Sequence, residues 1–378
     1  MPMTIIIFII ILALLIFVHE LGHFLLAKKF GVRVDEFGLG FPPRLLGKKF
    51  GETIYSLNWI PFGGFVKIFG ENPDEESLRG PDRTRSLGHK PRSVQALVLV
   101  AGVSFNLIFA WLLISVGFMS GLPSSVAGLG DNARFSTPAH LVLTQILPAS
   151  PAEIAGLKVG DELVYLRDAT GVSSPAANQL TPELVKEFVR ARGGEELIVG
   201  YRRGQLFGER LPPVRSLKLQ PIEGVVEGQA AIGVAMDKIA ILKLPIHRAF
   251  FEGVKLTAQL TYYTAVGLVT FVVDALRGQG GLANVTGPVG LASLVGDAAS
   301  LGWIYLLNFT AFISINLAVI NILPFPALDG GRLFFLLIEK IKGSMISPKI
   351  ANSVNLVGFG LLILLMLVVT YHDIVKLF

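Results

Sequence analysis

Four long apolar runs constrain this chain more than any other feature of its sequence. Each is long enough for a helix to cross the hydrocarbon core of a membrane, which takes about 20 mostly apolar residues. The runs are residues 3–24, 96–119, 301–323 and 354–371. The composition agrees, because 52% hydrophobic and only 16% charged residues is far from a soluble average. We therefore expect an α-helical multi-pass membrane protein with four transmembrane helices.

The basic residues predict which side of the membrane each loop faces, since Lys and Arg near helix ends mark the cytoplasmic side. Residues 1–27 contain no Lys or Arg, whereas the stretch from Lys28 to Arg92 contains twelve. A second basic stretch begins at Arg332, after the third run. We expect a protein of the cell (inner) membrane with both termini extracytoplasmic. The basic residues are spread along the chain and flank the apolar runs, so they do not predict a nucleic-acid partner.

A fifth apolar stretch, residues 256–273, is borderline in hydropathy and flanked by charged residues. If it crossed the membrane, the C-terminal ends of the first and third runs would lie on opposite faces. The distribution of basic residues favours the other arrangement. We predict that this stretch lies along the outer surface within an amphipathic segment, residues 246–300.

The segment from residue 123 to residue 245 has the composition of a small α+β domain. Residues 143–166, LTQILPASPAEIAGLKVGDELVYL, predict a strand, a short helix with Ser150 as N-cap, a turn at Gly160 and a second strand. A second helix is predicted to start at Thr181. Further strands are expected at residues 196–201 and 230–236.

This pattern resembles a PDZ domain of the bacterial protease type over about residues 136–237. Such domains bind an extended peptide or a chain terminus as an added strand at a sheet edge. We expect such a peptide partner, and a role as a gate or selector of substrates. A spacer domain without a ligand is the alternative.

The first apolar run contains the sequence HELGH at residues 19–23. On a helix, residues four apart share a face, so His19 and His23 can offer two imidazole nitrogens to one metal ion. Glu20 can reach a water molecule at that ion without binding the ion itself. This is the HExxH arrangement of zinc peptidases. A wet helix end is the alternative, although ionisable groups within a span are costly and usually functional.

A third ligand is needed, because catalytic zinc sites commonly have three protein ligands and an open position. The chain has no cysteine. The best candidate is Asp329 in NILPFPALDGGRL, residues 321–333, just beyond the third run. It can meet His19 and His23 only if the first and third helices run parallel. A cytoplasmic turn capped by the aspartate is the alternative.

Together these motifs resemble the site-2 protease family (peptidase family M50), which are intramembrane zinc metalloproteases. The resemblance rests on four motifs along the chain: HELGH at 19–23, AGVSFN at 101–106, TGPVGL at 286–291 and NILPFPALDGG at 321–331. It implies that His19, His23 and Asp329 bind Zn²⁺. It also implies that Glu20 is the catalytic residue, which takes a proton from the attacking water and delivers it to the leaving amine.

The second of these motifs departs from the family pattern, because Val103 stands where a proline is usual. Asn106 and Asn321 remain as polar groups near the expected site. They are predicted to contact the substrate backbone, and helix-to-helix hydrogen bonding is an equal alternative.

The resemblance implies regulated intramembrane proteolysis. The substrates would be transmembrane segments of single-span membrane proteins in the lipid bilayer, such as anti-sigma factors or remnant signal peptides. A membrane metal-ion transporter and a catalytically inactive PDZ scaffold are the competing functions. Ligands clustered near one membrane face argue against the transporter, and the presence of Glu20 argues against the scaffold.

A membrane-associated β-hairpin is expected in the first cytoplasmic loop. Residues 53–60 alternate so that Tyr55, Leu57 and Trp59 share one face. A turn at residues 61–64 would lead into a second strand at 65–69. An exposed edge of this hairpin is predicted to pair with the unwound substrate. A hairpin that only packs on the membrane surface is the alternative.

The expected parts of the chain follow one another in this order: a transmembrane helix with HExxH (1–26), a cytoplasmic loop with the hairpin (27–95), a second transmembrane helix (96–122), an extracytoplasmic region with the PDZ-like domain (123–245), an extracytoplasmic amphipathic segment (246–300), a third transmembrane helix (301–326), a cytoplasmic loop with the LDG motif (327–352) and a fourth transmembrane helix (353–372).

Overall fold

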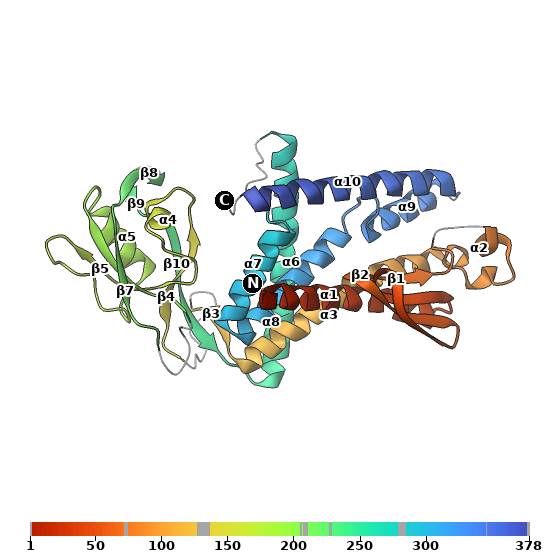
Figure 1. The fold of residues 1–378 in the computed structure, drawn as a ribbon, viewed down its shortest axis with the longest axis horizontal. Coiled ribbons are helices and arrows are strands. Elements are labelled where there is room, and N and C mark those ends of the chain that lie inside the picture. The colour runs from red at the N-terminus through yellow and green to blue at the C-terminus, as the bar shows by residue number, and fades with distance from the viewer. Residues whose placement is uncertain are drawn as a thin grey trace. The chain divides into compact units, whose positions relative to one another are not determined.

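The computed structural model in Figure 1 divides into two compact units. Met1–Ser115 and Phe250–Phe378 form the first, which we call the helical unit, and Val116–Ala249 form the second, the inserted unit. The residues that the structure describes are 2–71, 75–126, 137–204, 206, 211–226, 229–278, 285–344 and 346–375.

Long apolar helices dominate the helical unit. Its helices, two of which continue into the inserted unit, are α1 (Pro2–Lys29), α2 (Glu75–Arg79), α3 (Arg92–Ser120), α6 (Ile246–Leu276), α7 (Pro288–Leu301), α8 (Trp303–Asn321), α9 (Asp329–Lys342) and α10 (Pro348–Val375). Among the described residues, five of these helices are long and apolar enough to cross a membrane: α1, α3, α6, α8 and α10. The four predicted runs are thus helical. Figure 1 shows α6 running crosswise to α1 and α10.

Helices α1, α7 and α8 share an apolar core. Phe8, Ile11 and Leu15 of α1 pack in one cluster with Val295 of α7 and Ile313 of α8. The contact of α1 with α3 is much closer. A side chain at Gly22 would place its Cβ 2.5 Å from the Ala101 carbonyl oxygen of α3. Small residues at a helix interface allow this backbone approach, and it brings α3 against the face of α1 that carries the histidines.

The N-terminus of α7 is capped by a carboxylate from α10. The Gly287 and Gly290 N–H groups donate hydrogen bonds to Asp373 Oδ1 and Oδ2, at 3.1 and 2.8 Å. The first N–H groups of a helix lack intrahelical partners and favour a negative charge. A side chain at Gly287 would place its Cβ 2.7 Å from Asp373 Oδ2. The glycine in the TGPVGL motif therefore leaves room for this cap.

We expect Asp373→Ala to lower the stability of the helical unit. The substitution leaves two N–H groups at the helix start unpaired, and the loss of a partner for the buried one at Gly287 costs about 1–3 kcal/mol. Thermal unfolding of the purified protein in detergent should therefore begin at a lower temperature. Asp297→Ala on α7, where the aspartate is exposed, is the matched control and should leave the melting temperature unchanged. Equal melting temperatures for the two variants would contradict the capping role.

The predicted hairpin is wrong in its pairing. Strand β1 (Val34–Phe50) pairs with β2 (Thr53–Ile68), and β2 contains both predicted strands, 53–60 and 65–69, up to Ile68. The two halves of β2 do not pair with each other. Residues 36–39 of β1 instead face 54–57 on one side and 64–67 on the other.

Glycines make this insertion of β1 possible. A side chain at Gly38 would meet the Phe65 ring at 2.6 Å, and one at Gly40 would meet the Ile60 carbonyl oxygen at the same distance. Gly40 also has a φ of 79°, which L-residues with side chains rarely adopt. The alternation of residues 53–60 predicts a strand correctly, but local alternation carries no information about a partner earlier in the chain.

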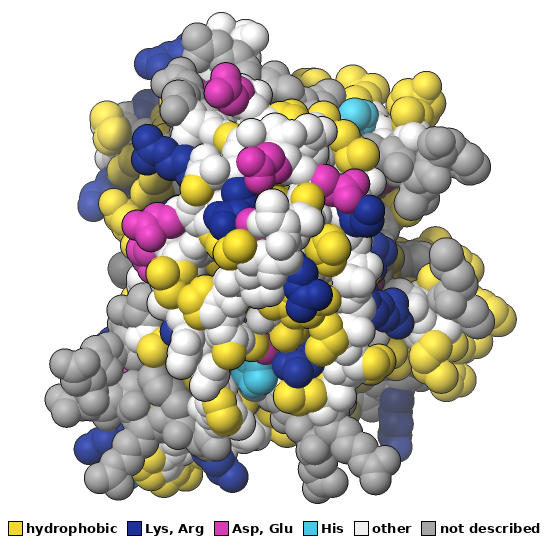
Figure 2. Space-filling view, turned by 90° about the vertical axis from the view of Figure 1, so that its left-hand side faces the viewer, with side chains coloured by type: hydrophobic (Ala, Val, Ile, Leu, Met, Phe, Trp, Pro, Cys, Tyr) yellow, Lys and Arg dark blue, Asp and Glu magenta, His cyan; other side chains and the backbone are white. Residues whose placement is uncertain are grey.

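The inserted unit contains an antiparallel sheet with short helices. Its elements are β3 (Leu122–Ser125), β4 (His140–Ile146), α4 (Pro151–Ile154), β5 (Glu162–Asp168), α5 (Pro182–Arg190), β6 (Leu197–Arg202), β7 (Arg215–Leu219), β8 (Ile222–Val226), β9 (Gln229–Ala231) and β10 (Val234–Leu242). Six strands form one sheet in the order β3-β10-β4-β5-β6-β7, and β8 pairs with β9. The core is aliphatic, and on the face in Figure 2 basic and acidic side chains are interspersed among neutral ones.

The predicted helix starts are confirmed. The Ser150 side chain accepts a hydrogen bond from the Glu153 N–H at 3.3 Å, and Thr181 accepts one from the Leu184 N–H at 3.2 Å. Both caps are followed by a proline, which suits the first position of a helix. The predicted strand at 230–236 is interrupted at Gly233, where φ is 78°, and divides between β9 and β10.

Candidate metal centre

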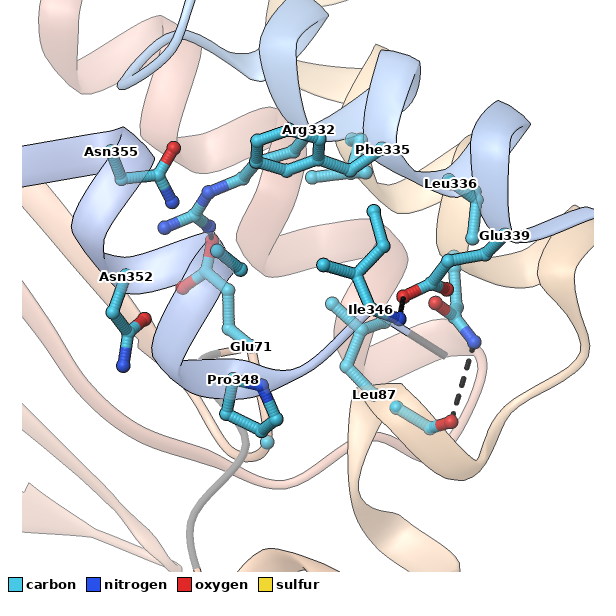
Figure 3. Close-up of a pocket in the computed structure, with 15 residues that line it drawn as sticks. Glu71, Leu87, Arg332, Phe335, Leu336, Glu339, Ile346, Pro348, Asn352 and Asn355 are labelled. Carbon is cyan, nitrogen blue, oxygen red and sulfur yellow. Dashed lines mark hydrogen bonds and ion pairs between the residues drawn. The ribbon is translucent and has the colours of Figure 1, made fainter. Parts of the chain in front are cut away.

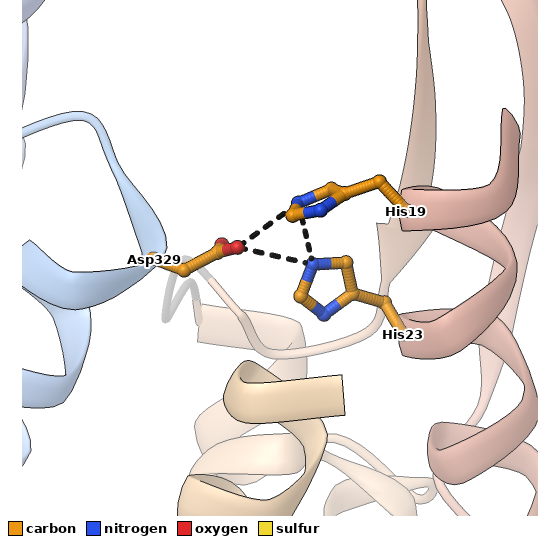
Figure 4. Close-up of side chains that lie close together, drawn as sticks. All are labelled: His19, His23 and Asp329. Atoms are coloured by element: carbon orange, nitrogen blue, oxygen red, sulfur yellow. Dashed lines mark hydrogen bonds and ion pairs between the residues drawn. The ribbon is translucent and has the colours of Figure 1, made fainter. Parts of the chain in front are cut away.

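Three predicted ligands converge at one point in the helical unit, as Figure 4 shows. His19 Nε2 lies 3.0 Å from Asp329 Oδ2, and His23 Nε2 lies 3.3 Å from the same oxygen. The two Nε2 atoms are 3.2 Å apart. The histidines come from one face of α1, and Asp329 is the first residue of α9. The convergence of α1 and α9 is thus the arrangement that a shared ion requires.

Closely packed backbone holds Asp329 in place. After α8 ends at Asn321, the chain turns through two prolines before α9 begins. A side chain at Gly330 would collide with the carbonyl oxygens of Ile322 and Leu323, and one at Gly331 would collide with that of Phe325. The two glycines of the LDGG sequence are therefore needed because no Cβ fits there.

Hydrogen bonds on the far side of each ring orient the two histidines. His23 Nδ1 lies 2.8 Å from the Val98 carbonyl oxygen, so it must carry the proton and donate it. His19 Nδ1 lies 3.3 Å from the Asn106 side-chain amide, and the buried Asn106 Oδ1 has no hydrogen-bond partner. A half-turn of that amide lets Oδ1 accept the Nδ1–H of His19. Both Nε2 lone pairs then point at the centre, as in metal sites whose ligands are fixed from behind.

The residues present fit a zinc ion. Asp329 Oδ2 is buried and receives no hydrogen bond, although two imidazole nitrogens face it. The histidines are only 9% and 7% exposed. Lone pairs directed at one another in a buried place repel unless a cation lies between them. Two imidazoles and one carboxylate are a common catalytic zinc ligand set, which leaves one position open for water or substrate.

The main chain of α3 forms one wall of the site at Gly102. A side chain at this position would collide with His23 Nε2 and would place its Cβ 2.7 Å from His19 Cε1. The sequence did not reveal this role of Gly102. A glycine in the middle of a long helix is the signal that could have indicated it, because glycine weakens helices and is retained there for close packing.

Glu20 lies beside the second half of β2. The Val66 backbone is a hydrogen-bond partner of the Glu20 carboxylate, and a Cβ at Gly64 would lie 3.7 Å from Glu20 Cγ. Asn321 is the last residue of α8 and is half-buried, and none of the hydrogen bonds recorded for the described residues joins it to the cluster.

Tyr55, Leu57 and Trp59 lie on an exposed face of β2. Ser56 and Asn58, which alternate with them, are buried. The predicted alternation is therefore confirmed over residues 55–59, whereas Thr53 is buried and Ile60 is exposed, against the pattern. A contact of the three exposed side chains with substrate stays a prediction.

Peptidase family M50 matches residues 7–365 of this chain. The chain is 36% identical to a putative zinc metalloprotease of Clostridium perfringens, over 96% of this chain and 95% of that relative. It is 30% identical to the zinc metalloprotease RasP of Geobacillus kaustophilus, over 99% and 98% of the two chains. It is 28% identical to the regulator of sigma-W protease RasP of Bacillus subtilis, over 99% of both. The chain therefore belongs to peptidase family M50, and it is an intramembrane zinc metalloprotease.

Proposed function

We propose that the chain hydrolyses peptide bonds in transmembrane segments of single-span membrane proteins, with His19, His23 and Asp329 as the zinc ligands. One observation carries this proposal. The three ligand atoms meet within 3.3 Å of one another, at the end of an apolar helix that also carries Glu20.

Zinc supplies Lewis acidity, which makes water a better nucleophile and stabilises negative charge on oxygen. Glu20 follows His19 directly, so its carboxylate can accept a proton from the attacking water. Glu20 then delivers this proton to the leaving amine nitrogen. Asn106 and the Val98 carbonyl group fix the tautomer and the direction of the two imidazoles.

The edge of β2 next to Glu20 is where we expect the substrate to be held. Residues 64–67 pair with β1 on one side only, whereas residues 54–57 pair with β1 on both sides. A free edge presents unpaired N–H and C=O groups that can pair with an unwound segment. The Val66 contact brings this edge to the catalytic carboxylate. Tyr55, Leu57 and Trp59 would then contact the substrate or the lipid through their exposed face.

We propose four membrane-spanning helices, α1, α3, α8 and α10, with both termini on the outer side of the cell (inner) membrane. Helix α6 would lie along the outer surface. Its crosswise direction relative to α1 and α10 supports this placement, although its length and composition would allow a crossing. The asymmetric distribution of Lys and Arg supports the same orientation.

We propose that the inserted unit is a PDZ-like domain that binds an extended peptide at β10. Among the described strands, residues 234–237 pair with β4 alone, since β3 reaches only Ile239 to Leu242. Helix α5 packs against β9 and β10. A strand edge next to a helix is the arrangement that binds peptides by strand addition.

The name of the Bacillus subtilis relative, a regulator of sigma-W protease, bears on the substrate. We infer that substrates of this chain include anti-sigma factors or remnant signal peptides. A metal-ion transporter is less well supported. Among the described residues, the only group of His, Asp or Glu side chains able to hold a metal ion is His19, His23 and Asp329, whereas a transit path needs several.

Glu20→Gln should abolish cleavage while zinc stays bound, because the amide cannot accept the proton. Asp329→Ala should instead lose zinc, because it removes a ligand. Metal analysis of the purified variants, together with cleavage of a single-span substrate in detergent, separates the two effects. Substantial cleavage by Glu20→Gln would contradict the mechanism.

Gly102→Ala should weaken zinc binding by about 10- to 100-fold, the usual effect of disturbing groups that orient metal ligands. The added methyl group would occupy the space of the His19 and His23 rings. Gly360→Ala on α10 is the matched control, since a Cβ there meets nothing within 4 Å. Competition with a chelator measures the affinity, and equal values for the two variants would exclude the close-packing role.

Deletion of residues 136–237 should allow cleavage of substrates that still carry a folded outer domain. The pairing of β3 with Ile239–Leu242 survives this deletion, so the ends of the cut can be joined. Cleavage of a full-length and a truncated substrate is compared in proteoliposomes. Adding Glu20→Gln to the deletion is the control and should remove all cleavage. A deletion variant that still rejects the full-length substrate would refute the selector role.

A further inference from the structure

Helix α9 carries the third zinc ligand but is weakly anchored to the rest of the helical unit. The structure describes all of its residues, and only Gly330 and Gly331 are buried. Several of its apolar side chains are exposed: Phe334 is 46%, Leu337 52% and Ile341 81% exposed. Beyond the close backbone packing at Gly330 and Gly331, the packing of side chains therefore adds little to fix Asp329 at the first turn of α9.

One turn beyond Asp329, an ion pair joins α9 to the end of β2. Arg332 Nη1 forms this pair with Glu71 Oε1, and Figure 3 shows the Arg332 side chain reaching from α9 to Glu71. The side chains are only 27% and 22% exposed. Glu71 closes the turn after β2, because its N–H donates to the Ile68 carbonyl oxygen at 3.2 Å.

Residues 68–71, which we call the platform, are held by several contacts. The Phe69 N–H donates to the Arg33 carbonyl oxygen at 2.9 Å, and the Phe69 carbonyl accepts from the Leu87 N–H at 2.8 Å. The Arg33 guanidinium also stacks 3.7 Å from the centre of the Phe69 ring. Ile68, next to Phe69, belongs to the buried cluster that includes Ala27 of α1. The platform is thereby fixed to the C-terminal end of the helix that carries His19 and His23.

A cavity of about 120 Å³ lies where α9 and α10 face this platform. Polar side chains, among them Glu71, Arg332, Gln95 and Asn355, line it together with apolar ones (Figure 3). Side chains do not fill this cavity, and the ion pair between Arg332 and Glu71 lies along its wall. Partly exposed ion pairs contribute little net stability. We therefore expect the pair of Arg332 and Glu71 to fix the position of α9 more than it stabilises the fold.

We propose that Arg332 and Glu71 are a positioning pair, which sets the distance between the Asp329 carboxylate and the two histidines. This inference rests on the proposed function, because it assumes that Asp329 binds zinc. The pair also ties the ligand helix α9 to the strand whose free edge, residues 64–67, would hold the substrate. Metal binding and substrate alignment are thereby coupled through one contact.

Glu71→Gln in the full-length protein tests the pair. Glu71 is chosen because the charge of Arg332 also acts on Glu20, so that a change at Arg332 would alter two contacts. We expect the affinity for Zn²⁺, measured by chelator competition, to fall about 10- to 100-fold. The visible absorption spectrum of the Co²⁺-loaded variant should also change, because the Asp329 ligand is displaced. Glu196→Gln, which breaks the exposed pair with Lys218 in the inserted unit, is the matched control and should bind as the unaltered protein does.

A cross-link supplies a second, independent measurement. The chain has no cysteine, so Glu71→Cys combined with Arg332→Cys gives a single pair of thiols. Joining them with a short bifunctional reagent should restore much of the Zn²⁺ affinity that the unlinked double variant lacks. This arm remains informative even if Glu71→Gln fails to fold.

The two proposals fail in different ways. Zn²⁺ affinity within twofold of the unaltered protein for Glu71→Gln, or no recovery on cross-linking, would overturn the positioning role and leave the metal centre intact. Asp329→Ala with unchanged Zn²⁺ affinity would overturn the proposed ligand set itself.

Discussion

The close approach of α1 and α3 is the constraint on which the metal centre depends. Gly22 and Gly102 bring the two backbones together so closely that a methyl group at either position would collide with the neighbouring helix. This approach places the Val98 carbonyl group and the Asn106 amide behind the two imidazoles. The ring nitrogens that face Asp329 are thus determined by α3, a helix that supplies no metal ligand.

The site solves two problems of hydrolysis within a membrane by separate means. Ionisable groups are costly inside a span, and here His19, His23 and Asp329 lie close enough together to share a cation that would offset this cost. The substrate must also be unwound, because a transmembrane helix uses its own backbone groups in hydrogen bonds. In our proposal, the strand edge of residues 64–67 beside Glu20 would offer such a segment new backbone partners. The strand edge belongs to β2 and Glu20 to α1, and the two lie side by side at Gly64.

The sequence predicted the residues of the candidate metal centre more completely than the architecture. His19, Glu20 and His23 followed from helical spacing, and Asp329 from the need for a third ligand after a helix-breaking stretch. The Gly102 wall and the pair of Arg332 with Glu71 did not follow, because each joins segments far apart in the chain. For the hairpin, alternation identified the strand but not its partner. The sequence predicted that the two halves of β2 pair directly with each other. In the structure, residues 36–39 of β1 lie between them.

By itself, the sequence determined that this chain is a membrane protein, where its long apolar helices run, and which side chains can bind a metal. These properties depend on hydrophobicity and spacing within one segment, which are local quantities. Only the tertiary structure decided which segments touch, which imidazole nitrogen faces the ion and which strand edge stays free. Those outcomes depend on glycines that admit a neighbouring backbone and on hydrogen bonds between distant residues, and no local pattern encodes such contacts.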